Sequence, residues 1–216
     1  MAFIIKDSGG GKDFEQHPAG VFPARCVRIV DLGTQDESFE GQAKTLRKMA
    51  FFFETNQLLT EGEYAGKPFM LNREFTCSLG EKATLRKSLE SWRGRKFTNE
   101  EVKGFEITAV LGKPLMLNIV EYTKKTTGKM GTKIDSMMPL PSGMIAEKAV
   151  GDVFFFNLYD DEGNVKKLDS ESYGKLSEYW KKKIALSPEY KQATSGKSSQ
   201  QEMSAGDNDD DSDIPF

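Results

Sequence analysis

The sequence contains few of the residues that build most metal centres and nucleophilic active sites. Its 216 residues include one histidine, His17, and two cysteines, Cys26 and Cys77. Any Ser-His, Cys-His or histidine-metal arrangement would have to use the same single imidazole. The cysteines lack CxxC spacing, so we expect reduced, buried thiols and no disulfide or zinc framework. These shortages argue against an enzyme, and we expect no cofactor and no metal.

Long apolar runs are also missing. No segment approaches the ~18 consecutive apolar residues of a membrane-spanning helix. Residues 1–20 hold no apolar run long enough for a signal peptide. We therefore expect a cytoplasmic protein with no membrane contact. With 38% hydrophobic residues, the chain can build the core of one ordinary domain and carry appendages.

Acidic residues are concentrated at one end of the chain. The formal net charge is −3, yet the five aspartates between positions 207 and 213 contribute −5, so residues 1–206 carry +2. A mildly basic body joined to a short anionic segment suggests a polyanionic partner. The anionic segment would mimic that partner or compete with it.

The order of predicted elements indicates a mainly β protein. Strand-like segments bounded by Gly, Pro and Asn occupy most of residues 20–140. One helix interrupts them between the third and fourth strands, because Leu85, Leu89 and Trp92 recur at helical spacing and Gly94 supplies a stop. This is the element order of a five-stranded OB-fold barrel, which is the predicted fold.

A C-terminal extension is predicted to pack on this barrel. Residues 160–164 have good turn chemistry for a hairpin, and Asp169 or Ser170 can cap a helix that follows. The apolar stripe of that helix consists of Tyr173, Leu176, Trp180 and Ile184. Ser187-Pro188 is predicted to end it.

These patterns divide the chain into five segments. They are a flexible arm at 1–17, the OB-fold domain at 18–150, the hairpin and helix extension at 151–190, a disordered linker at 191–206 and an acidic tip at 207–216. The linker is too poor in apolar residues to offset the entropy lost on ordering.

Familiar phosphate and calcium motifs do not fit the sequence. In the arm, Gly11-Lys12 is followed by Asp13 and has no preceding strand, which excludes a Walker A loop. The aspartate cluster near the end lacks the glycine and the bidentate glutamate of a calcium loop. A metal-dependent nuclease would need clustered carboxylates, and the strands offer only scattered ones.

The strands do contain Lys and Arg alternating with aromatic residues. The two-residue period of the strand at 44–56 places Phe51 and Phe53 in the barrel interior and Phe52 with Lys48 outside. Single-stranded nucleic acid needs such a surface, because its phosphates attract cations and its bases stack on exposed rings. The candidate contacts are Arg25, Arg28, Lys48, Phe52, Arg73, Tyr122, Lys124, Lys125, Lys129 and Lys133. Against this, basic residues are scattered on many sheets and most aromatic residues are core, as we expect for Trp92.

The last eight residues, DDDSDIPF, resemble the acidic C-terminal tip of bacterial single-stranded DNA-binding proteins. The resemblance implies that this tip recruits replication and repair proteins. Its apolar residues would enter a small pocket, while the aspartates would speed the encounter with a basic surface. The tip residues are Asp209, Asp210, Asp211, Asp213, Ile214, Pro215 and Phe216.

The body, over about residues 18–190, is instead similar to bacteriophage single-stranded DNA-binding proteins. The similar segments are ARCVRIVDLGTQ, SLGEKATLRKSLESWRGRKFT, LGKPLMLNIV and LSEYWKKKIALSPEY. The resemblance implies a non-catalytic protein that coats single-stranded DNA without sequence preference in phage replication, recombination and repair. It would act in the cytoplasm of the infected host and recruit phage or host replication and recombination proteins. The alternative is a protein-binding adaptor with an OB-like body and little DNA affinity.

Overall fold

The computed structural model describes residues 15–39 and 42–195. The predicted acidic tip and most of the predicted linker lie outside the described residues, as does most of the N-terminal arm. The roles assigned to the tip therefore stay predictions.

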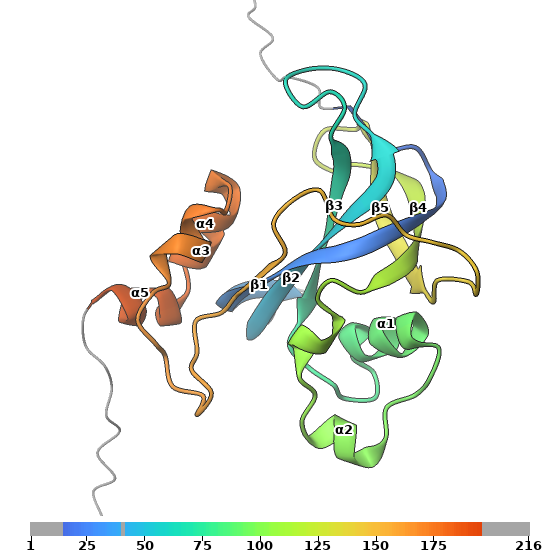
Figure 1. Cartoon of the computed structure of the whole chain (residues 1–216). Coiled ribbons are helices and arrows are strands. Elements are labelled where there is room, and N and C mark those ends of the chain that lie inside the picture. Colours follow the sequence, from blue (N-terminus) through green and yellow to red (C-terminus); the bar gives the residue numbers. More distant parts are fainter. Residues whose placement is uncertain (1–14, 40–41, 196–216) are drawn as a thin grey trace, which may run out of the picture.

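Within the described residues, six strands form one sheet (Figure 1). They are β1 (Gly20–Phe39), β2 (Gln42–Leu58), β3 (Pro68–Thr76), β4 (Pro114–Thr123), β5 (Met130–Met138) and β6 (Phe154–Phe156). Five of them are antiparallel in the order β3-β2-β1-β4-β5, and β6 pairs in parallel with β1. The prediction of a mainly β protein is confirmed.

The sheet is not the closed five-stranded barrel that the sequence predicts. In the described part of the chain, no ladder joins the outer strands β3 and β5. Barrel closure requires a matched register around every strand, and here a side chain stands between the two outer strands. Arg73 of β3 donates from Nη1 to the backbone carbonyl oxygen of Asp135 in β5 at 2.7 Å. The sixth strand, β6, lies in the segment predicted to form the first strand of a hairpin, but it pairs in parallel with β1 instead.

The inner face of the sheet packs on the segment between β3 and β4. This segment contains α1 (Thr84–Arg93), α2 (Asn99–Lys103) and a 3-10 turn, η1 (Ile107–Val110). The predicted helix is confirmed as α1, since Leu85, Leu89 and Trp92 are buried in the core. Gly94 ends α1 in the left-handed conformation, with φ of 65°, which glycine adopts without steric cost. Phe51 and Phe53 also lie in this core, as predicted.

The outer face of β1 and β2 is covered by the C-terminal extension, which lies to one side of the sheet in Figure 1. Its helices are α3 (Ser170–Gly174), α4 (Glu178–Ala185) and α5 (Pro188–Thr194). Lys183 of α4 pairs with Glu74 of β3 at 2.5 Å. Glu189 of α5 accepts hydrogen bonds from the Thr34 N–H at 2.9 Å and the Tyr159 hydroxyl at 2.7 Å. These contacts fix the helices to the sheet.

The details of the extension differ from the sequence prediction. Asp169 caps α3, as predicted, by accepting from the N–H groups of Glu171 and Ser172. The single predicted helix is divided into α3 and α4, and Ser187-Pro188 begins α5 rather than ending a helix, because proline fits the first helical turn. The predicted turn at 160–164 is bounded by one antiparallel bridge, between Tyr159 and Val165. Helix α5 runs through Thr194, into the segment predicted to be linker. None of the described helices is long and apolar enough to cross a membrane.

Candidate nucleic-acid interface and a neighbouring cleft

Five of the ten predicted DNA contacts lie together on the β4–β5 hairpin. We call residues 121–135 the basic hairpin. It contains four lysines and two acidic residues, Glu121 and Asp135, so its formal charge is +2. The five predicted residues on it are Tyr122, Lys124, Lys125, Lys129 and Lys133.

Tyr122 supplies an accessible ring on this hairpin. Its side chain is 37% exposed, and its register partner on β5 is Gly131, which carries no side chain to cover the ring. A Cβ at position 131 would lie 2.7 Å from Cε of Lys124 and 3.3 Å from Cε1 of Tyr122. Nζ of Lys133 lies 5.4 Å from the centre of the Tyr122 ring. A ring and two ammonium groups therefore share one small surface.

The turn between the strands gathers the remaining lysines. The Lys124 N–H donates to the Lys129 carbonyl at 2.9 Å, and the Gly128 N–H donates to the Lys124 carbonyl at 2.8 Å. Gly128 has φ of 68°, which closes the turn without strain. Lys125 is exposed on the same turn. The turn thus concentrates positive charge in a short, largely exposed segment.

Arg73, Arg25 and Lys48 make contacts that hold parts of the fold together. Arg73 joins β3 to β5 and lies 5.2 Å from the centre of the Phe75 ring, and burial lowers its pKa. Arg25 donates to the carbonyl oxygens of residues 112, 146 and 147 at 2.6–2.9 Å. Lys48 pairs with Glu37 at 2.7 Å. Arg73 contacts the basic hairpin only at Asp135, its last residue, and the structure does not bring Arg25 or Lys48 to it.

The prediction for Phe52 is wrong. Strand alternation places its ring on the outer face of β2, as expected, but α4 covers that face. Phe52 is 5% exposed, and its ring meets the Trp180 ring edge-on at a centroid distance of 5.1 Å. The ring belongs to a second core and has no exposed face on which a base can stack.

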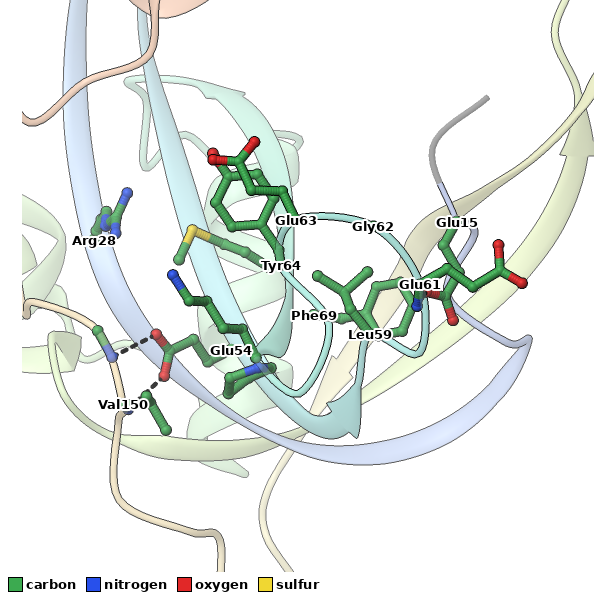
Figure 2. Close-up of a pocket in the computed structure, with 14 residues that line it drawn as sticks. Glu15, Arg28, Glu54, Leu59, Glu61, Gly62, Glu63, Tyr64, Phe69 and Val150 are labelled. Carbon is green, nitrogen blue, oxygen red and sulfur yellow. Dashed lines mark hydrogen bonds between the residues drawn. The ribbon is translucent and has the colours of Figure 1, made fainter. Parts of the chain in front are cut away.

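Arg28 lies in a cleft of about 910 Å³ that sequence reasoning missed (Figure 2). We call it the acidic cleft. Its charged lining residues are Glu15, Glu54, Glu61, Glu63, Arg28 and Lys67, with a formal charge of −2. Its apolar walls include Leu59, Tyr64, Phe69, Met70 and Val150. These residues come from separate segments of the chain, so no short sequence pattern predicts the cleft.

Two of the glutamates hold the walls of the cleft in place. Glu15 accepts from the Thr60 N–H at 2.8 Å, the Thr60 hydroxyl at 2.9 Å and the Glu61 N–H at 3.2 Å. The hydrogen bond from the Thr60 N–H lowers the pKa of Glu15 the most. Glu54 accepts from the N–H groups of Val150 and Gly151 at 2.8 and 2.9 Å, as Figure 2 shows. The segment around residue 150 is therefore tied to β2.

The remaining charged groups of the cleft are less constrained. Nε of Arg28 is buried and has no hydrogen-bond partner in the described part of the chain, while its guanidinium lies 5.3 Å from the centre of the Phe154 ring. Tyr64 is 52% exposed, and Nζ of Lys67 lies 5.1 Å from its ring centre. The cleft is therefore lined both by Arg28, whose Nε has no partner in the described part of the chain, and by exposed apolar side chains such as that of Tyr64.

Comparison with protein-family models and with curated proteins found no match for this chain. Among the described residues, no group of three or more His, Cys, Asp or Glu side chains is arranged to hold a metal ion.

Proposed function

We propose that this chain is a single-stranded DNA-binding protein that holds the strand on its basic hairpin. The observation that carries the proposal is the grouping of exposed Tyr122 with four lysines on one β-hairpin. Lysines bind phosphates with release of counterions, and an exposed ring stacks on unpaired bases of any sequence. Together they supply affinity without base readout.

The strand order supports the finer assignment of an OB-type sheet. The order β3-β2-β1-β4-β5, with Arg73 bridging the outer strands, is compatible with a barrel left open between β3 and β5. OB-folds are partly open barrels that bind oligonucleotides with the β1–β2 and β4–β5 loops and the faces of strands 2 and 3. The basic hairpin carries the β4–β5 loop.

The wider biological role rests on the sequence resemblances. We propose that the protein coats single-stranded DNA during phage replication, recombination and repair, inside the infected host cell. The acidic tip, including Ile214, Pro215 and Phe216, would recruit phage or host proteins to the coated strand. We propose no catalytic activity and no cofactor.

The direct test is a fluorescence titration of labelled oligothymidine with the full chain at two salt concentrations. We expect tight binding that weakens with salt. Tyr122→Ala should cost about 1–3 kcal/mol of binding free energy, the range for loss of one stacking ring. Tyr122→Phe should retain most of the affinity, since the ring is kept.

Tyr179→Ala is the matched control, because Tyr179 is a 63% exposed tyrosine on α4, away from the hairpin. It should bind DNA like the unmodified chain. Equal losses from Tyr122→Ala and Tyr179→Ala would contradict a specific role for the hairpin. No binding by the unmodified chain would contradict the function itself and leave the protein-binding adaptor as the better account.

A further inference from the structure

We infer that the acidic cleft is a docking site for the chain's own N-terminal segment Phe3-Ile4-Ile5-Lys6, and that this docking is independent of DNA binding. The segment lies outside the described residues, and the cleft that would hold it lies at the point where the described residues begin.

The charge of the cleft opposes a nucleic acid and favours a cationic ligand. Its formal charge is −2, so a phosphate backbone would be repelled. Glu15 and Glu54 are occupied by backbone N–H groups. Glu61 and Glu63, on the exposed loop, make no side-chain ion pair in the described part of the chain. They are the groups that can pair with a lysine of the ligand.

The walls of the cleft favour an apolar peptide beside that lysine. Tyr64, Met70 and Val150 are among the exposed large hydrophobic residues of the molecule, and all three line the cleft. Burying such surface against an apolar ligand is favourable. The guanidinium of Arg28, which lines the cleft, can donate hydrogen bonds to the carbonyl oxygens of an extended peptide. The ligand that fits is a short apolar segment flanked by a cation.

The chain carries such a segment close to the site. Phe3, Ile4 and Ile5 form an apolar run, and Lys6 follows it. Glu15 is the first described residue, and it lines the cleft. Eight residues lie between Lys6 and Glu15, so the two can be at most about 30 Å apart, while Gly9-Gly10-Gly11 permits the reversal of direction that docking needs. A tether of this length gives an effective concentration in the mM range.

The test places a spin label on the segment and observes a methyl group in the cleft. The full chain carries Ser8→Cys for the label and Cys77→Ser to remove the half-buried thiol, since Cys26 is fully buried. Methionine methyl groups are isotope-labelled. We expect the Met70 methyl signal to lose most of its intensity, while the Met137 signal in the core near α1 keeps it.

Charge exchange distinguishes docking from chance proximity. Glu61→Lys with Glu63→Lys should restore the Met70 signal, and adding Lys6→Glu to that variant should remove it again. Asp161→Lys with Glu162→Lys makes the same charge change on an exposed turn that does not line the cleft, and should leave the loss at Met70 unchanged. Unaltered core methyl signals in each variant verify folding.

Two outcomes would overturn the inference. One is a Met70 signal that keeps its intensity in the spin-labelled chain. The other is loss of the Met70 signal when spin-labelled and isotope-labelled chains are separate molecules in one mixed sample, because the occupant would then be a second copy. Neither result depends on DNA, so DNA titration of the same chains judges the proposed function separately.

Discussion

The basic hairpin and the acidic cleft lie toward the same end of the sheet and carry opposite charge. Residues Ala24 and Thr55 are paired, as are Gly20 and Ile119, so β2 and β4 both end near the start of β1 (Figure 1). Each region has an exposed tyrosine with a lysine nitrogen 5.1 or 5.4 Å from its ring centre. A tyrosine and lysine pair therefore does not define a DNA surface; the sign of the surrounding charge separates the two regions.

The two regions also differ in how they are built. The basic hairpin is one continuous segment whose turn is closed by its own backbone hydrogen bonds. The cleft depends on contacts between distant segments, such as Glu54 with Gly151 and Glu15 with Thr60. We therefore expect the cleft to respond to substitutions far from its walls and the hairpin to be insensitive to them.

The largest effect is expected where the C-terminal helices cover the sheet beside the cleft. Trp180→Ala removes a buried ring that packs on Phe52 and should lower the free energy of unfolding by about 3–5 kcal/mol. Urea unfolding measures it, with Tyr179→Ala, an exposed neighbour, as the control. Exposing Phe52 in this way should not raise DNA affinity. A gain in affinity would mean that Phe52 can bind DNA and that the DNA surface is not confined to the basic hairpin.

Reversing the charge of the hairpin should produce the next largest effect. Lys124→Glu, Lys125→Glu and Lys133→Glu together should weaken oligothymidine binding on the order of 100-fold at low salt and reduce the salt slope by about 0.7 for each phosphate that the hairpin no longer binds. The matched control is Lys82→Glu, Lys87→Glu and Lys103→Glu on and beside α1 and α2, which should cost far less. Equal losses in both triple variants would mean that only net charge matters.

A smaller effect is expected from the wall of the cleft. A Cβ at position 151 would lie 2.6 Å from Oε1 of Glu54, so Gly151→Ala should displace the carboxylate from two backbone N–H groups. We expect a loss of about 1–3 kcal/mol in unfolding free energy and faster hydrogen exchange of the amide of residue 150. Gly104→Ala, with open space around its Cβ, is the control. DNA affinity should be unchanged by either substitution.

The smallest effect is expected at Glu101, a partly buried carboxylate that belongs to neither region. Hydrogen bonds from Arg95 and from the Thr98 N–H lower the pKa of Glu101 from 4.5 to about 2. A lowered carboxylate pKa stabilises the fold above the ordinary value, and this contribution is lost as the pH falls from about 4.5 toward 2. Glu101→Gln should remove that part of the acid sensitivity in thermal melts from pH 5 to 2. An unchanged pH profile would show that solvent screens the pair completely.

Local patterns in the sequence predicted the elements better than their surroundings. Leu85, Leu89 and Trp92 indicated α1 correctly, and alternation placed Phe51 and Phe53 inside. The same alternation put Phe52 on the outer face but gave no sign that Trp180, more than a hundred residues later, would cover it. The sequence also did not predict that β3 and β5 would be joined by Arg73 and not by a strand ladder, since this depends on how two strands distant in sequence approach each other.

In the candidate site, too, residues close together in sequence were easier to predict than contacts between distant segments. The grouping of Tyr122 with its lysines could be predicted because these residues are close in sequence and share one hairpin. Arg28 was taken for a surface residue, and its place in a cleft with Glu54 and Tyr64 became visible only in the folded chain. Neither Gly62 nor Gly66, whose positive φ shapes the loop around Tyr64, carries a motif that predicts a binding site.

Photo-crosslinking of the full chain to oligothymidine that contains 4-thiothymidine, followed by mass spectrometry of the linked peptides, tests whether DNA lies on the basic hairpin. We expect the dominant crosslinks to fall on the basic hairpin, at Tyr122 or the lysines around it, and to decrease with salt. Dominant crosslinks at Tyr64 and the loop of the acidic cleft, with none on the hairpin, would show that the strand does not bind to the hairpin.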